Sequence, residues 1–435
     1  MELRTLFINI WSIFITSFLV LLKFFSFFSL SLRKKILKRE LTNKMLQELS
    51  RERAKVETCF IFFCSSAGEL EQALPIIQEY KEDPKVMILV IFFSESGLIY
   101  NATQDYKINH ILSPFDTLTN WKKIIYATDP TVTVVVRHEL WPCFLHLASK
   151  HSKLLLINAS SPSGTKGSYL KKKIKTFLYS FFDKICLVSS LDLKFFLKNF
   201  AIQEKNLTVT SDTKYDKAIK NIAQKSKAFL AWEQEWKLTH DSKKKTLIVG
   251  SAWEEDIFNI LEAVDHLQDQ FFEKFQIIIV PHEPTKKLVK HTEKLCFRKG
   301  LRSKVFPSEK GSGNEKNKII IVGILGILKD LYRYADMVFV GGAFHYQVHN
   351  VLEPAAFGVP TAFGPLYKNS REAIELVSSG KSCVTINPVE IAKWWQASSK
   401  VNKQDSKNIE KHLLNFLGAK QKVMHEIDGF LTSNK

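Results

Sequence analysis

The stretch GGAFHYQVHNVLEPAAFGVPTAFGPLYKNSRE, residues Gly341 to Glu372, says most about the fold of this chain. It follows an apolar run, Met337 to Val340, that is typical of a short buried strand. Its Gly-Gly pair and the helix-like segment that Glu353 begins indicate a strand-to-helix turn. Glycines let a ligand approach the backbone, and a helix amino end offers free N–H groups to an anion. The stretch therefore predicts an α/β domain with a ligand-binding loop, while a structural turn without a ligand fits the same pattern.

Short apolar runs alternate with amphipathic stretches along most of the chain, which predicts βαβ units and parallel sheets. The expected strands form two groups: residues 60–63, 86–93, 132–136, 154–157 and 185–188, and then residues 246–249, 276–280, 319–322 and 337–340. A polar, lysine-rich passage, residues 213–245, lies between the groups. Two successive doubly wound, Rossmann-like domains would face each other across a cleft at the carboxyl ends of their strands, where open α/β folds bind ligands.

The amino terminus carries an uncharged apolar segment, residues 6–22, and after Lys23 the sequence stays mostly apolar to residue 32. This length suffices for one helix across a hydrocarbon core of about 30 Å. The basic run Arg33 to Lys35 follows without a small-residue cleavage site, so we expect an uncleaved membrane-anchor helix and a cytoplasmic remainder. Lys23 leaves open an interfacial helix that only dips into one leaflet.

We therefore expect four parts in the chain. They are a membrane anchor with a basic collar at 1–40, a first Rossmann-like domain at 41–212, a linker region at 213–245, and a second Rossmann-like domain with carboxyl-terminal helices at 246–435.

Charge and cysteine content narrow the classes of partner. The net charge of +18 over 435 residues favours polyanions: nucleic acid, an anionic membrane surface or a phosphorylated lipid. No recognisable nucleic-acid-binding module occurs, so we expect no nucleic acid partner. The basic cluster Lys171 to Lys175 beside bulky apolar residues either lies on an anionic bilayer or is a solvated helix face. The six cysteines are dispersed without a C-x-x-C pair, which indicates reduced thiols and no structural zinc.

Two polar motifs follow expected strands in the first half of the chain. The segment SSAGE, residues 65–69, opens a helix, where Glu69 could complement the helix dipole or act as a catalytic base. The segment RHELWP, residues 137–142, leaves a buried strand. There Trp141 could be a packing anchor with Glu139 paired to Arg137, or the pair could belong to a binding site.

Loops that follow expected strands in the second half of the chain could hold an anionic ligand, as could one segment just before that half. The loop GSAWEED, residues 250–256, brings Ser251 and neighbouring N–H groups to a helix start, where they could hold a phosphate. The segment SDTKYD, residues 211–216, contains Lys214, which could pair with a phosphate or carboxylate or be one of many solvated lysines. Further loops of this kind are PHEP (281–284) and GILGI (323–327).

These motifs, in this order, resemble those of the bacterial 3-deoxy-D-manno-octulosonic acid (Kdo) transferases. The likeness rests on Gly341-Gly342, HNVLEPAA (349–356) and FGP (363–365), together with SSAGE, ELWP and SDTKYD. It covers roughly residues 60 to 390. The resemblance implies a GT-B glycosyltransferase whose first domain binds the acceptor and whose second domain binds the donor, CMP-Kdo.

The family resemblance also implies roles for individual residues. Glu69 would be the general base, and Glu139 and Trp141 would shape the acceptor side. Donor-nucleotide contacts are implied for Ser251, Pro281, His282, Leu325, Gly326, Ile327, Asn350, Val351, Leu352, Glu353 and Lys214. His282 could instead be a satisfied histidine at a strand end. No Asp-x-Asp metal clamp and no Walker-type loop occur in the sequence, in agreement with a family that works without a metal or cofactor besides its donor substrate.

The resemblance implies transfer of Kdo from CMP-Kdo to a lipid A precursor (lipid IVA), with inversion and release of CMP, at the cytoplasmic face of the inner membrane and next to its anionic lipid. Ser211 stands where the family has glycine, and Ser160 stands where many members have arginine, so acceptor contacts in the second of these loops are not carried over. Two alternatives remain: a GT-B transferase for a different nucleotide sugar, and a non-catalytic, membrane-bound sugar-nucleotide-binding protein.

Overall fold

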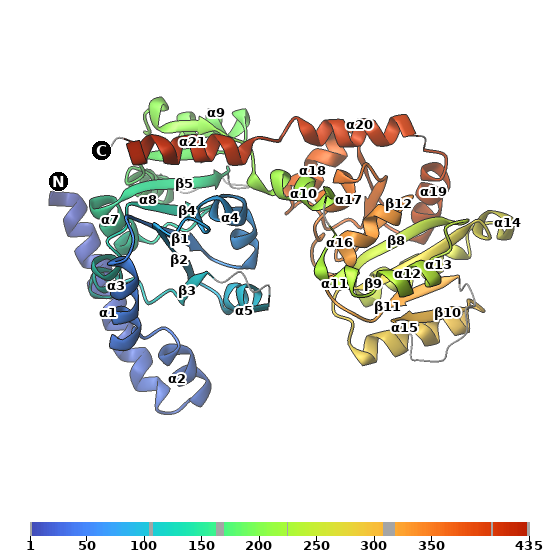
Figure 1. Cartoon of the computed structure of the whole chain (residues 1–435), viewed down its shortest axis with the longest axis horizontal. Helices are drawn as coiled ribbons and strands as arrows, with labels where there is room; N and C mark the ends of the chain where they lie inside the picture. The colour runs from blue at the N-terminus through green and yellow to red at the C-terminus, as the bar shows by residue number, and fades with distance from the viewer. Residues whose placement is uncertain are drawn as a thin grey trace. The chain divides into compact units, whose positions relative to one another are not determined.

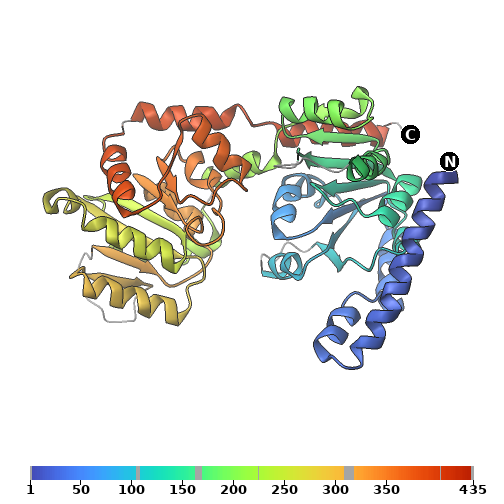
Figure 2. The ribbon, with the colours of Figure 1, turned by 180° about the vertical axis from the view of Figure 1, so that it is seen from behind.

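The computed structural model describes residues 2–103, 108–161, 169–223, 225–307, 318–401 and 403–432. Its contacts divide the chain into two compact units, which Figures 1 and 2 show from opposite sides. Unit 1 comprises Met1–Lys217 and Phe416–Lys435, and unit 2 comprises Ala218–Asn415. The expectation of two doubly wound α/β domains is confirmed.

The described part of unit 1 holds a sheet of seven parallel strands in the order β3-β2-β1-β4-β5-β6-β7. The strands are β1 (Thr58–Cys64), β2 (Val86–Phe92), β3 (Asn109–Leu112), β4 (Val132–Val136), β5 (Lys153–Ala159), β6 (Lys184–Leu187) and β7 (Leu207–Val209). The helices around it are α3 (Asn43–Arg53), α4 (Ala67–Tyr80), α5 (Glu95–Thr103), α6 (Leu118–Thr128), α7 (Pro142–His151), α8 (Tyr169–Tyr179), α9 (Ser190–Asn199) and α21 (Ala419–Thr432), with the short 3-10 helix η1 (Glu204–Asn206).

The apolar runs of the sequence become strands because both faces of this sheet are covered. Side chains alternate between faces along a strand, so Ile61 and Phe63 of β1 enter one core cluster while Phe60 and Phe62 enter the other. All four side chains are completely buried. Continuous apolar strands are what a parallel sheet with two covered faces requires.

The described part of unit 2 repeats the plan, with seven parallel strands in the order β10-β11-β9-β8-β12-β13-β14. The strands are β8 (Lys245–Ala252), β9 (Phe275–Pro281), β10 (Ser303–Phe306), β11 (Ile319–Val322), β12 (Met337–Val340), β13 (Thr361–Phe363) and β14 (Ser382–Val384). The helices are α11 (Lys227–Leu230), α12 (Glu233–Thr239), α13 (Glu254–Val264), α14 (Asp269–Phe272), α15 (Lys286–Arg298), α16 (Leu328–Leu331), α17 (Leu352–Ala356), α18 (Arg371–Ser378), α19 (Pro388–Ser398) and α20 (Lys403–Leu414), with the 3-10 helix η2 (Tyr332–Tyr334). Helix α10 (Thr213–Ala223) begins in unit 1 and ends in unit 2.

The last helix belongs to unit 1, which differs from the expected second domain of 246–435. Val423 and Ile427 of α21 are completely buried in the core cluster that also holds Phe60 and Phe62. Glu426 accepts a hydrogen bond from the hydroxyl of Thr208 at 2.7 Å. The apolar face of α21 therefore completes the cover of the first sheet rather than the second.

The passage 213–245 also differs from a simple linker, because it forms helices α10, α11 and α12. Phe229 and Trp236 in this passage are completely buried. From Ala218 onward the segment is part of unit 2.

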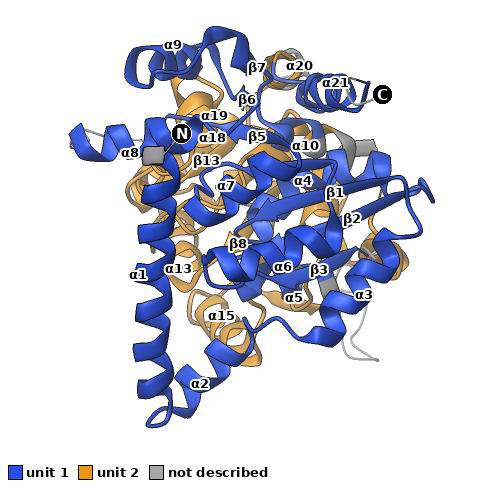
Figure 3. Cartoon of the chain, turned by 90° about the vertical axis from the view of Figure 1, so that its left-hand side faces the viewer, with its two compact units in different colours: residues 1–217, 416–435 blue, residues 218–415 orange. Residues whose placement is uncertain are grey.

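The amino-terminal helix α1 (Glu2–Ser26) runs along one side of unit 1, and α2 (Leu30–Leu37) follows it after a tight turn (Figure 3). Within the described residues, α1 is the one helix that is long and apolar enough to cross a membrane, over Arg4–Ser26. The predicted apolar helix at the amino terminus is therefore present.

Candidate active site

Glu69 lies in the first turn of α4, directly beyond the carboxyl end of β1. The chain leaves β1 at Cys64, and extended backbone at Ser66 starts the helix. The hydroxyl of Ser65 donates to the Glu69 carboxylate at 3.4 Å, and the hydroxyl of Ser66 donates to the same oxygen. The side chain is half-buried. The two serines therefore hold the carboxylate on the loop, where its other oxygen can accept a proton.

Glu139 lies in the neighbouring loop, after β4, close enough to Glu69 for the two carboxyl charges to interact. The indole N–H of Trp141 donates to Glu139 at 2.8 Å, and the Trp141 ring stacks on Phe93 with 4.9 Å between centroids. Burial raises the pKa of Glu139, and the charge of Glu69 acts in the same direction, while hydrogen bonds from Trp141 and Ser65 oppose both. The structure does not pair Glu139 with Arg137. Trp141 donates a hydrogen bond to the Glu139 carboxylate, and the Arg137 guanidinium lies beside Asp212.

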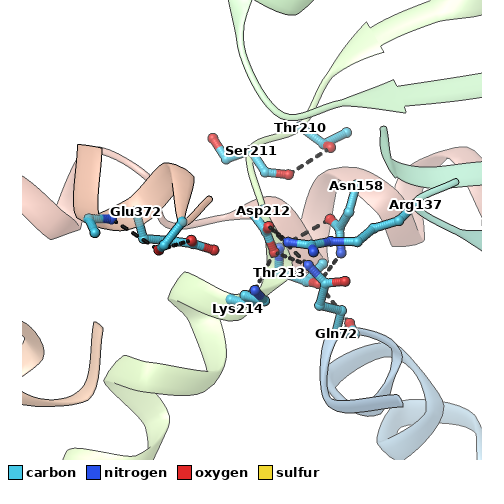
Figure 4. Close-up of polar contacts among 11 residues, drawn as sticks. Gln72, Arg137, Asn158, Thr210, Ser211, Asp212, Thr213, Lys214 and Glu372 are labelled. Carbon is cyan, nitrogen blue, oxygen red and sulfur yellow. Dashed lines mark hydrogen bonds and ion pairs between the residues drawn. The ribbon is translucent and has the colours of Figure 1, made fainter. Parts of the chain in front are cut away.

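A polar network centred on Asp212 ties together the loops of unit 1 (Figure 4). The amide of Gln72 donates to both carboxylate oxygens of Asp212 at 3.0 Å, and the Arg137 guanidinium lies 3.8 Å from it. Asn158 donates to the Thr213 hydroxyl at 2.8 Å, and that hydroxyl donates to the backbone carbonyl of Gln72 at 2.7 Å. Because Gln72 follows Glu69 by three residues on α4, the network fixes the helix that carries the candidate base.

Three residues of this network region have left-handed backbone conformations. The φ angles are 63° at Arg137, 55° at Asn158 and 73° at Ser211, at the ends of β4, β5 and β7. Side chains other than glycine adopt this region at a cost of about 1–2 kcal/mol. Ser211 thus keeps the backbone angle for which the family pattern has glycine. The backbone N–H of Lys214 donates to Asp212 at 2.9 Å, which fixes the start of α10.

In unit 2, an aromatic stack joins the loops after β8, β9 and β12. The Trp253 ring stacks on His345 at 4.8 Å and on His282 at 5.2 Å, and His282 stacks on His349 at 4.2 Å. The indole N–H of Trp253 donates to Nε2 of His349 at 2.9 Å, which requires that this nitrogen carries no proton. Burial, and then His282, lower the pKa of His349 to about 4, so the ring is neutral near pH 7.

Asp256 fastens the loop after β8 to the Gly-Gly turn after β12. Its carboxylate accepts the backbone N–H groups of Trp253 at 2.9 Å and of Gly342 at 2.8 Å. Burial raises the pKa of Asp256 to about 6. A Cβ atom at Gly341 would lie 2.6 Å from the backbone oxygen of Ser251, so this turn needs glycine for close packing of two backbones. Ser251 itself has a φ of 51°.

The first turn of α13 is less suited to a phosphate than its sequence indicated. It carries Glu254, Glu255 and Asp256, and Asp256 already occupies the first free N–H. The negative charge of these carboxyl groups would repel a phosphate at this end of the helix.

The other predicted donor residues lie on loops at the same end of the second sheet. Pro281 ends β9, and the segment Leu325 to Ile327 follows β11, with Leu325 exposed and Gly326 at a φ of 86°. The side chain of Asn350 accepts the backbone N–H of Leu352 at 3.0 Å. Val351 and Leu352 are buried, and Glu353 lies in the first turn of α17.

Sequence reasoning missed Gln72 and assigned no role to Trp253, Asp256 or His345. The last three residues lie inside the sequence motifs described above. The motifs place them on the right loops, but their ring stacking and carboxylate hydrogen bonds appear only in the structure. The described residues contain no group of three or more His, Cys, Asp or Glu side chains placed to hold a metal ion.

Two parallel-sheet α/β units, each with its polar loops at the carboxyl ends of the strands, define the GT-B class of fold. Solved structures agree. UDP-GlcNAc 2-epimerase from Neisseria meningitidis bound to UDP-GlcNAc matches with a TM-score of 0.58 and 14% identity, covering 87% of this chain and 100% of that one.

Sequence comparisons then give the family. The model for 3-deoxy-D-manno-octulosonic-acid transferases (kdotransferases) matches residues 39–217. The 3-deoxy-D-manno-octulosonic acid transferase of Rickettsia typhi is 26% identical over 88% of this chain and 81% of its own length. The protein of the same name from Rickettsia prowazekii is 28% identical over 74% of this chain and 67% of its own length. Residues 39–217 therefore match the Kdo transferase family, and most of the chain is similar to proteins of that name.

Proposed function

We propose that this glycosyltransferase transfers Kdo from CMP-Kdo to a hydroxyl of a lipid A precursor, lipid IVA, and releases CMP. Similarity to Kdo transferases supports the donor, and the observation that carries the reaction is the position of Glu69. Its carboxylate stands at a strand end in the motif that matches the family pattern, and two serine hydroxyls hold it there.

Glu69 would act as general base. As the acceptor oxygen attacks the anomeric carbon of Kdo, its proton passes to the Glu69 carboxylate. The new C–O bond forms while the bond from the anomeric carbon to the CMP phosphate oxygen breaks, and CMP leaves with that electron pair. A single displacement inverts the anomeric carbon. Glu139 would stay near Glu69 to orient the acceptor, with Trp141 as its support.

The loops at the carboxyl ends of β8, β9, β11 and β12 would hold the donor nucleotide. The stacked rings of Trp253 and His282 offer a rigid wall next to Ser251 and the Gly-Gly turn. Lys214 would neutralise charge on the donor. Because the first turn of α13 is acidic, we place the phosphate on other backbone N–H groups and basic side chains. No cofactor or metal ion is part of the proposed reaction.

Purified protein incubated with CMP-Kdo and lipid IVA tests this function by mass spectrometry of the lipid. We expect a lipid heavier by one or more Kdo residues, together with CMP. Substitution of UDP-GlcNAc for CMP-Kdo tests the alternative GT-B transferase. Transfer from UDP-GlcNAc alone, or binding of CMP-Kdo without any product, would contradict the proposal.

We further propose that the enzyme works on the cytoplasmic face of the inner membrane, because its acceptor is a membrane lipid. The apolar α1 helix and the charge of +18 support contact with anionic lipid.

A further inference from the structure

The amino-terminal half of α1 is built into unit 1. Ile8 is completely buried, and the ring of Phe7 contacts Phe177 of α8 edge-on with 5.1 Å between centroids. The indole N–H of Trp11 donates to Asp116 at 2.8 Å. The hydroxyl of Ser12 accepts the backbone N–H of Leu118, the first residue of α6, at 3.0 Å.

Asp116 makes this attachment specific. Its buried carboxylate also accepts the indole N–H of Trp121 at 2.8 Å and the backbone N–H groups of Cys143 and Phe144, in the first turn of α7, at 3.2 and 3.1 Å. Trp11 thus supplies one of the donors that stabilise a buried charge. Removing α1 from unit 1 would leave that charge with one partner fewer and would uncover the Ile8 site.

The other end of α1 is attached to unit 1 through α2. Lys23 pairs with Glu40 at 2.8 Å, just beyond α2. Arg39 donates to the backbone oxygens of Ser113 at 2.9 Å and Phe93 at 2.6 Å. The carboxyl end of α1 is thus connected to unit 1 through α2 and Arg39, and Figure 3 shows α1 along one side of the unit.

This attachment leaves too little helix for a span. With residues 7–12 packed against unit 1, the stretch from Ile13 to Ser26 has about 14 residues and a length of about 21 Å. A hydrocarbon core is about 30 Å thick.

The outward face of α1 is nevertheless apolar along its whole length. The exposed fractions range from 57% at Leu21 to 80% at Phe28 for six side chains in and just after the helix: Ile10, Ile13, Phe14, Leu21, Phe24 and Phe28. Basic residues flank this face at both ends. The exposed side chains of Arg33 to Lys35 lie on α2, and those of Lys171 to Lys173 lie on α8, which Phe177 joins to α1.

We propose that α1 lies in the plane of a bilayer, inserted by its outward face into one leaflet of anionic lipid, and does not cross the membrane. The apolar face would enter the acyl region while the lysines of α2 and α8 meet phosphate headgroups. The amino terminus would then be on the same side of the membrane as the two units. This proposal does not depend on the reaction that the enzyme catalyses.

Cysteine labelling in vesicles tests the topology. Cys383 is the exposed cysteine among the six, all of which lie in described segments, so it reports the side of the folded units. Full-length Thr5→Cys protein is reconstituted into vesicles of phosphatidylethanolamine and phosphatidylglycerol and treated with a membrane-impermeant maleimide. Labelling of each cysteine before and after detergent is measured by peptide mass spectrometry. Lys35→Cys is the matched control, because its side chain lies with the folded units in either topology.

We expect the labelled fraction at residue 5 to equal that at Cys383 in every preparation, whatever the mixture of orientations. A spanning helix would make the two fractions complementary, with their sum near the total, and that result would overturn the proposal. Recovery of the protein in the soluble fraction after sedimentation with these vesicles would overturn it as well.

Depth measurements provide a second test. Fluorescent labels at Ile10→Cys, Phe14→Cys and Leu21→Cys are quenched by lipids brominated at different acyl positions. An in-plane helix predicts one shallow depth for all three labels. A depth that changes steadily along the helix through the bilayer centre would contradict the proposal.

Discussion

At the scale of single residues, the buried ring of His349 makes the stability of unit 2 depend on pH. Its pKa of about 4 lies below the ordinary value of 6.5 because burial and His282 disfavour the charged ring. The unfolded chain therefore binds more protons than the folded chain between about pH 6.5 and pH 4. This group stabilises the fold fully above pH 6.5, and its contribution is lost as the pH falls toward 4.

We therefore predict that the His349 ring does not titrate near pH 6.5. NMR of protein with ¹³C-labelled histidine, with the signal assigned from its loss in His349→Gln, would show no inflection between pH 8 and pH 5.5. An inflection near pH 6.5 would contradict the hydrogen bond from Trp253 to Nε2.

A substitution at Gly341 tests how closely the loop after β12 approaches the loop after β8. In Gly341→Ala the new Cβ would lie 2.6 Å from the oxygen of Ser251 and 2.7 Å from Asp256, so we expect a loss of about 1–3 kcal/mol in unfolding free energy. The control is Gly429→Ala in α21, where the Cβ meets nothing within 4 Å and helix propensity favours alanine. Chemical denaturation measures both. Equal stability of Gly341→Ala and the unchanged protein would contradict the packing described.

At the scale of elements, strands made of continuous apolar residues were predictable, including four-residue β11 and β12, while strands with polar or exposed residues were not. β1, β2, β4, β9 and β11 carry buried side chains on both faces, which the sequence displays directly. β7 and β14 have three residues each and lie at sheet edges, where half-buried polar residues give no clear pattern. The position of α21 was also hidden, because an amphipathic helix shows that it covers a core and not which core it covers.

We predict that Ile427→Ala destabilises unit 1 by about 2–5 kcal/mol, since Ile427 is completely buried against the first sheet. Hydrogen exchange followed by mass spectrometry would show faster exchange in the strands of unit 1 and no change in unit 2. Ile374→Ala, at a partly exposed position of α18, is the control. Faster exchange in unit 2 would instead support the sequence-based division at 246–435.

At the scale of the whole molecule, the sequence indicated two α/β domains and a resemblance to Kdo transferases, while the contacts within each site required coordinates. Glu69 was found from a motif at a strand end, a local pattern that sequence preserves. Gln72 and Asp212 meet across 140 positions of sequence, and Trp11 and Asp116 meet across 105, so no local pattern could join them. Chain topology, rather than residue spacing, brings such groups together.

The rate of Kdo transfer by Glu69→Gln tests the central claim most directly. The substitution keeps the size of the side chain and removes its ability to take a proton, so we predict a fall in kcat of about 10²–10⁴-fold with CMP-Kdo and lipid IVA. Glu82→Gln, at an exposed carboxylate of unit 1 that pairs with Lys81, should transfer at the unchanged rate. A Glu69→Gln enzyme that transfers Kdo as fast as this control would contradict the role of Glu69 as the base.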